Sequence, residues 1–154
     1  MEYGSIEREI RIEAAPEIVY EVVSRPEHLR EWWPDDADLV PVPGATGTVT
    51  FGDPSAPDAK VQEITVVEAD PPRRFAFRWV YDDGVAPAPG TSLLVTFELV
   101  PAGVGTLLRF TETGYRERGW EAAVLEETYR DHTIGWDYFL PRLSSYLERL
   151  VSAP

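Results

Sequence analysis

The fold is decided by the stretch LEETYRDHTIGWDYFLPRLSSYLERL, residues 125–150. Its apolar residues recur every three or four positions, the spacing that places side chains on one face of an α-helix. Pro141 lies inside the stretch and removes one backbone donor, so we predict a bend near Asp137 or Tyr138. The stripe comprises Leu125, Tyr129, His132, Trp136, Leu140, Leu143, Leu147 and Leu150. A long helix with one apolar face must be covered by another element.

The preceding residues supply that cover as a series of strands. Ile6, Ile10 and Ile12 alternate with charged residues, which predicts a first strand with one wet face. Pro16 and Pro26 are placed to begin two short helices, the second reaching Trp33. Further strands are expected at residues 38–42, 47–52, 59–69, 73–82, 92–100 and 105–113, because the segments between them are rich in Pro, Gly and Asp.

These elements predict one α+β domain over residues 1–154. A chain of this length is long enough for one domain with its own core and too short to expect two. The economical arrangement is a curved antiparallel sheet of about seven strands wrapped around the long C-terminal helix, with two short helices after the first strand.

Composition excludes several classes of partner. The chain has 27 Asp and Glu against 14 Lys and Arg, a net charge of −13, so we expect neither a nucleic-acid nor a membrane partner. It contains no Cys and two His, and we expect no metal and no other cofactor. The N-terminus lacks the apolar core of a signal peptide, and no apolar run approaches the ~20 residues of a membrane span. A cytoplasmic protein is the simplest interpretation.

Aromatic side chains are abundant, with five Trp, seven Tyr and six Phe. Phe75, Phe77, Trp79 and Tyr81 share one parity on a predicted strand, so we expect all four rings on the same face. Inward-facing rings either fill a core or line a pocket for an apolar ligand, and both interpretations stay open. The candidate ligand-binding residues are Trp32, Trp33, Phe51, Phe77, Trp79, Tyr81, Phe97, Phe110, Tyr129, His132, Trp136 and Phe139.

His132 is the polar member of this set. It falls within the apolar stripe of the last helix, where an imidazole without a partner would be costly to bury. Strand parity places Glu112 on the same face as Leu108 and Phe110. A Glu112–His132 pair could orient a polar ligand group or act as an acid/base couple, and both are our candidate catalytic residues. The alternative is a core histidine bonded to a backbone carbonyl or to water.

Four stretches carry a resemblance to a known family. They are residues 26–33 (PEHLREWW), residues 71–79 (PPRRFAFRW), residues 95–99 (VTFEL) followed by 105–108 (GTLL), and residues 132–136 (HTIGW). In this order they resemble the SRPBCC, or START-like, superfamily, and within it the activator of heat-shock-protein ATPase homologue family. The resemblance implies a helix-grip fold with an internal cavity. Members of the superfamily include lipid carriers, polyketide cyclases and hydroxylase components.

Three functional hypotheses follow. The first is binding of a small, mostly hydrophobic molecule, aromatic, lipid or polyketide-like, between the sheet and the C-terminal helix. The second is a cyclase or dehydratase-type enzyme that uses His132 and Glu112, and the sequence leaves open whether a reaction is catalysed. The third is an interaction module with a chaperone ATPase as partner, which predicts a filled core and an exposed apolar patch near Trp120 or residues 85–89. A homodimer through the last helix or a strand edge is a further hypothesis.

Overall fold

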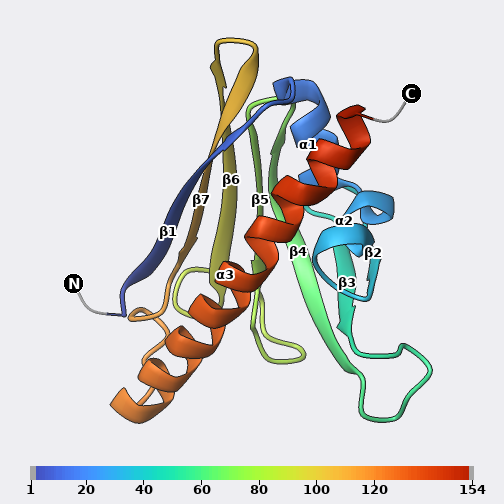
Figure 1. The fold of residues 1–154 in the computed structure, drawn as a ribbon. Coiled ribbons are helices and arrows are strands. Elements are labelled where there is room, and N and C mark those ends of the chain that lie inside the picture. Colours follow the sequence, from blue (N-terminus) through green and yellow to red (C-terminus); the bar gives the residue numbers. More distant parts are fainter. Residues whose placement is uncertain (1–2, 153–154) are drawn as a thin grey trace.

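A long helix closes the concave side of an antiparallel sheet in the computed structural model, which describes residues 3–152 (Figure 1). The elements follow the predicted order of one strand, two short helices, six strands and a long helix. They are β1 (Ser5–Ile12), α1 (Pro16–Ser24), α2 (Pro26–Trp32), β2 (Asp36–Asp38), β3 (Thr46–Phe51), β4 (Lys60–Asp70), β5 (Arg74–Trp79), β6 (Leu93–Ala102), β7 (Gly105–Thr113) and α3 (Ala122–Ser152).

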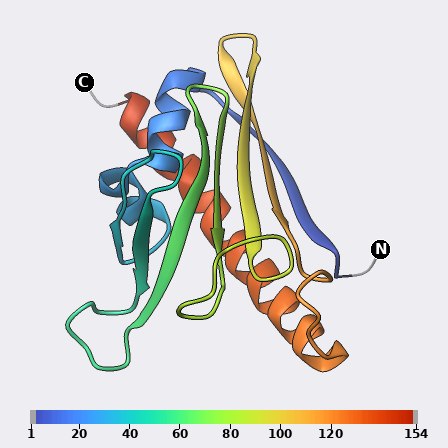
Figure 2. The same cartoon turned by 180° about the vertical axis from the view of Figure 1, so that it is seen from behind.

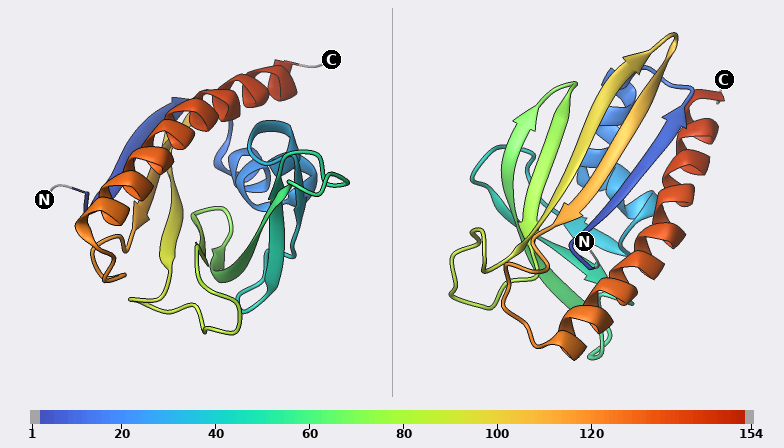
Figure 3. Two further views of the ribbon diagram at one scale, coloured as in Figure 1. Left: turned by 90° about the horizontal axis from the view of Figure 1, so that it is seen from below. Right: turned by 90° about the vertical axis from the view of Figure 1, so that its left-hand side faces the viewer.

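The seven strands form one sheet in the order β1-β7-β6-β5-β4-β3-β2. Every pairing is antiparallel, and the first strand closes against the last, with Ser5 opposite Thr113 and Ile12 opposite Thr106. Figure 2 shows the outer face of the sheet, with the helices behind it. Seen from below, the sheet curves around the interior and α3 spans its open side (Figure 3). The predicted helix-grip fold is confirmed.

Alternation along the strands decides which side chains face the helix. On β7 the residues Thr106, Leu108, Phe110 and Glu112 are all fully buried. They share one parity and therefore one face, while the intervening Arg109 lies outside and pairs with Glu9 of β1. This alternation carries a carboxylate, Glu112, into the interior together with apolar neighbours.

The two short helices begin at the expected prolines. Pro26 disfavours helical backbone at the residue before it, and Arg25 is accordingly extended, with φ −98° and ψ 134°, so α1 ends at Ser24. The indole Nε1 of Trp32 donates to the carbonyl of Val22 at 3.0 Å, which ties α2 to α1. The pair thereby places Trp33, the residue after α2, against the interior.

The long helix buries Trp136, Leu140, Leu143 and Leu147. It begins three residues before the predicted stripe and passes through Pro141 as one continuous helix. Leu150, which we expected on the buried stripe, is 37% exposed because it lies in the last turn of the helix, past the buried segment.

Two strand predictions need correction. The segment expected at 38–42 is a three-residue strand, β2, that ends at Asp38, and Pro41 and Pro43 then break the ladder because proline has no donor. β5 ends at Trp79 rather than at residue 82. The next residue, Val80, has a left-handed backbone with φ 57°, which takes the chain off the sheet.

Candidate functional site

A buried carboxylate lies at the centre of the candidate site. Glu112 is fully buried and accepts hydrogen bonds from four side chains. The indole of Trp79 donates to Oε2 at 2.7 Å, and the indole of Trp136 donates to Oε1 at 3.0 Å. Nδ1 of His132 lies 2.8 Å from Oε1, and the hydroxyl of Tyr115 also donates to Oε1. The contact between Glu112 and His132 that parity predicted is therefore present.

Four segments of the chain meet at this carboxylate. Trp79 ends β5, Glu112 stands one residue before the end of β7, and His132 and Trp136 are one helical turn apart on α3. Tyr115 reaches Glu112 because Gly114 turns the chain with φ +108°. A Cβ at Gly114 would lie 2.9 Å from the carbonyl oxygen of Ser92, so the turn has no space for a side chain.

The hydrogen bonds assign the protonation of the groups around Glu112. Burial, and then the carboxylate of Glu112, raise the pKa of Tyr115, which keeps its hydroxyl protonated as a donor. An indole nitrogen can only donate, and an ionised carboxylate can only accept. With an ionised Glu112, Nδ1 of His132 is the donor in this pair, and the neutral tautomer that donates from Nδ1 keeps a lone pair on Nε2. No hydrogen bond joins Nε2 to another of residues 3–152.

His132 also lines a pocket whose walls do not include Glu112. This ring-lined pocket has a volume of about 140 Å³ and is formed by Trp33, Phe51, Trp79, Asp131, His132, Gly135, Trp136 and Phe139. A cavity of about 150 Å³ lined by apolar side chains is sufficient to bind benzene. A Cβ at Gly135 would meet nothing within 4 Å, so the helix leaves space at the pocket. The pocket is the size of one aromatic ring.

Half of the twelve candidate ligand-binding residues line this pocket. They are Trp33, Phe51, Trp79, His132, Trp136 and Phe139. Trp32, Phe77, Phe97 and Phe110 are instead buried in the core. The ring centroids of Phe110 and Trp136 are 4.5 Å apart, and those of Trp33 and Trp136 are 5.2 Å apart. Aromatic packing thus occupies much of the space between the sheet and α3.

Two of the candidates lie elsewhere for identifiable reasons. Tyr81 was expected on the face of Trp79, but its hydroxyl bonds Thr65 at 2.8 Å. Thr65 pairs with Arg78 and therefore lies on the opposite face, so the left-handed Val80 has reversed the expected parity. Tyr129 donates to the carbonyl of Ser5 at 2.8 Å and links the start of α3 to β1.

Sequence reasoning missed three residues of the site. Tyr115 was not a candidate, although it follows Glu112 by three positions across a glycine. Asp131 and Gly135 line the pocket. With Phe139 they are spaced by four, so helical spacing from Phe139 would have indicated both.

The structure also tests for a metal site and for a membrane-spanning helix. Within residues 3–152 no group of three or more His, Cys, Asp or Glu side chains is placed to hold a metal ion. His28, the second histidine, lies with its Nδ1 2.7 Å from the hydroxyl of Tyr146, far along α3 from His132. None of the helices in the described part of the chain is long and apolar enough to cross a membrane.

The curved seven-stranded sheet, the two short helices and the long closing helix define a helix-grip protein of the START-like, or SRPBCC, class. Residues 13–148 match the family model AHSA1, described as Activator of Hsp90 ATPase homolog 1-like protein. The chain belongs to this family. A comparison with curated proteins gave no match.

Solved structures support the fold. Protein MLL2253 from Mesorhizobium loti has 23% sequence identity and a TM-score of 0.74, with 94% of this chain and 97% of that chain covered. The Aha1 dimer from Colwellia psychrerythraea has 22% identity and a TM-score of 0.67, over 94% and 96%. DynU16, from the dynemicin biosynthetic locus, has 24% identity and a TM-score of 0.70, over 94% of this chain and 47% of that one.

Proposed function

We propose that this protein binds a small, mostly apolar molecule by enclosing one of its rings in the ring-lined pocket. The observation that carries the proposal is the position of His132. Its Nδ1 is bonded to the buried Glu112, while its ring lines a pocket otherwise made mainly of aromatic side chains. A pocket with apolar walls and one oriented polar group is the usual form of a small-molecule site.

The hydrogen bonds also indicate the chemistry of the ligand. With Nδ1 donating to Glu112, Nε2 of His132 can accept a hydrogen bond from the ligand. Asp131 adds a second acceptor to the lining. An aromatic ring with a hydroxyl group therefore fits the pocket better than the same ring without one.

Phenol and toluene form a matched pair of probes for this proposal. Both have the size of one ring, but only phenol can donate to His132. Titration followed through the indole N–H resonances of Trp79 and Trp136 should show phenol binding about 2- to 10-fold more tightly, the value of one neutral hydrogen bond. Equal binding of the two probes, or none, would contradict the proposal.

Variants at two positions test the pocket and the hydrogen bond from the ligand to His132 separately. Gly135→Leu should fill the pocket and abolish binding of both probes, whereas Gly135→Ala should retain it and stabilise α3 by up to ~1 kcal/mol. His132→Phe should remove the preference for phenol. Because that variant takes a donor from Glu112, its folding must be checked by circular dichroism, and Gly135→Leu tests the pocket independently.

The geometry favours a second candidate function, a cyclase or dehydratase-type enzyme. A carboxylate that fixes one nitrogen of an imidazole leaves the other nitrogen as a general base, and the 2.8 Å contact between Glu112 and His132 has this form. Deuterium exchange at the carbon beside the ketone of 2-tetralone, measured in D₂O, would show whether His132 removes a proton as a general base. Exchange should be accelerated by the wild type and lost in His132→Gln and Glu112→Gln. An unaccelerated rate would leave binding as the function.

The family description supports a third candidate, interaction with a chaperone ATPase. The aromatic packing of the interior agrees with what that hypothesis predicts. Of the two expected patches, Val85 is 40% exposed, while Trp120 is half-buried with the guanidinium of Arg118 4.7 Å from its ring. A purified Hsp90 should hydrolyse ATP faster with this protein added, and an unchanged rate would exclude activation.

Light scattering of this protein by itself would test the homodimer hypothesis.

A further inference from the structure

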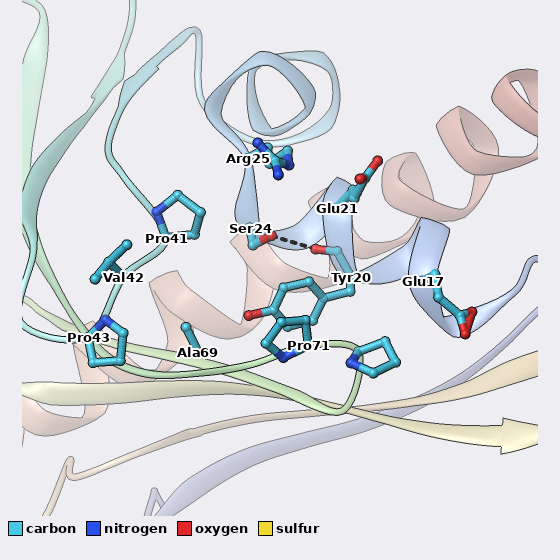
Figure 4. Close-up of a pocket in the computed structure, with 11 residues that line it drawn as sticks. Glu17, Tyr20, Glu21, Ser24, Arg25, Pro41, Val42, Pro43, Ala69 and Pro71 are labelled. Carbon is cyan, nitrogen blue, oxygen red and sulfur yellow. Dashed lines mark hydrogen bonds between the residues drawn. The ribbon is translucent and has the colours of Figure 1, made fainter.

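A second, larger hollow lies at the other end of β5 from the ring-lined pocket. We call it the proline-walled hollow, and its volume is about 540 Å³ (Figure 4). Pro71 and Pro72 precede β5 and contribute to its wall, whereas Trp79, a residue of the ring-lined pocket, ends the same strand. The two sites therefore have separate linings and can be tested separately.

The hydroxyl of Tyr20 is the unusual feature of this hollow. Tyr20 is 7% exposed, and its hydroxyl has no hydrogen-bond partner among residues 3–152. Figure 4 shows the oxygen directed toward the wall formed by Pro41, Val42 and Pro43. Burial, followed by the negative charges of Asp70 and Glu68, raises the pKa of Tyr20, so the group stays a protonated donor. Buried polar groups are nearly always paired, so this one calls for an acceptor.

The walls of the hollow are apolar and held in place. Pro41, Val42 and Pro43 form one side, and Pro71 and Pro72 form another. The first segment is fixed because the amide of Gly44 bonds the carbonyl of Val66 at 2.8 Å. Proline rings have few conformations to lose, so such walls are organised before a ligand arrives. Val42 is nevertheless 52% exposed, which leaves apolar surface available to cover.

The charges at the hollow select against anions. Glu17 and Glu21 of α1 belong to its lining, against the single cation Arg25. Because Glu68 and Asp70 also act on Tyr20, a carboxylate or phosphate on a ligand would meet like charge there. An uncharged oxygen acceptor avoids this repulsion and still pairs with the phenol.

We propose that the proline-walled hollow is a second ligand site, which takes an uncharged, mostly apolar molecule whose carbonyl oxygen accepts a hydrogen bond from Tyr20. The proposal does not depend on the ring-lined pocket or on His132. The two sites differ in ligand chemistry, since His132 offers an acceptor whereas Tyr20 offers a donor.

Benzophenone and diphenylmethane test this inference, because they differ by one carbonyl group. In a titration followed by amide resonances of the labelled full chain, benzophenone should shift the signals of Ser24, Val42 and Ala69. Diphenylmethane should bind about 2- to 10-fold more weakly, again the value of one hydrogen bond. Equal affinities, or shifts confined to α3, would overturn the proposal.

Tyr20→Phe is the matched variant. It keeps the ring, which packs edge-on against Phe75 at 6.2 Å, and removes only the hydroxyl that lacks a partner. We expect it to fold, to be at least as stable as the wild type, and to bind the two probes equally. Gly135→Leu should bind benzophenone like the wild type, which separates this site from the ring-lined pocket. Unchanged discrimination by Tyr20→Phe would show that Tyr20 does not recognise the carbonyl.

Discussion

Glu112 determines the chemistry of the interior, because a buried charge is tolerated only when hydrogen bonds replace its hydration. Trp79 bonds Oε2, and Tyr115, His132 and Trp136 bond Oε1, so the carboxylate holds the ends of β5 and β7 against α3. The same bonds orient the two indoles that border the ring-lined pocket. One residue thus links the stability of the fold to the geometry of the candidate site.

Glu112→Gln should therefore destabilise the protein strongly. The glutamine amide offers one acceptor oxygen and places an NH₂ donor against groups that are themselves donors, so at least one bond is lost and one donor is left buried. We expect the free energy of unfolding in urea to fall by about 2–4 kcal/mol. Glu98→Gln is the control, because Glu98 lies on the outer face of β6, is 36% exposed and pairs with Arg74. Its effect should stay below ~1 kcal/mol, and equal losses at both sites would contradict this interpretation.

At the scale of elements, an ion pair joins β1 to α3. The guanidinium of Arg8 donates to both carboxylate oxygens of Asp137, at 2.8 and 3.1 Å. This bond lowers the pKa of Asp137 below its usual value of 3.8. Asp137 is 52% exposed, so solvent screens the pair and limits its contribution. The pair fastens an edge strand to the helix that spans the sheet.

The contribution of this pair should depend on pH in a definite direction. Because the pKa of Asp137 is lowered in the folded state, its stabilisation is fully present above the unfolded value and is lost as pH falls through the folded one. Asp137→Asn should cost less than ~1 kcal/mol at pH 7, and the difference from the wild type should shrink toward pH 3. Urea unfolding of both proteins at several pH values measures this difference in the free energy of unfolding. A difference that grew on acidification would contradict the assignment.

Local periodicity explains which parts of this arrangement could be predicted from sequence. Strand alternation placed Glu112 inside, and helical spacing placed His132 opposite it, because each pattern depends only on nearby residues. The same rule failed for Tyr81, where the left-handed Val80 ends the alternation. Tyr115 could not be predicted, since its position depends on how the Gly114 turn packs against Ser92. How closely the rings pack likewise depends on distances across the fold, which no local pattern contains.

At the scale of the whole molecule, charge opposes folding. The net charge of −13 is spread along the chain, and compaction brings these acids closer together. Surface ion pairs such as Arg8–Asp137 and Arg109–Glu9 offset the repulsion, but exposed pairs contribute only about 0–1 kcal/mol each. Since acids outnumber bases by 27 to 14, at least 13 acids have no base to pair with one to one, and repulsion should be the larger effect.

Salt should therefore stabilise this protein at neutral pH. Raising KCl from about 0.01 M to 0.15 M shortens the screening length from about 30 Å to about 8 Å, which weakens repulsion across the molecule more than it weakens pairs in contact. We expect the melting temperature to rise by at least ~2 °C at pH 7, where 1 kcal/mol corresponds to about 2–4 °C for a chain of this size. The control is the same titration near pH 4.5, where the sequence has little net charge, and there the rise should vanish. A melting temperature that fell with KCl at pH 7 would mean that the ion pairs outweigh the repulsion.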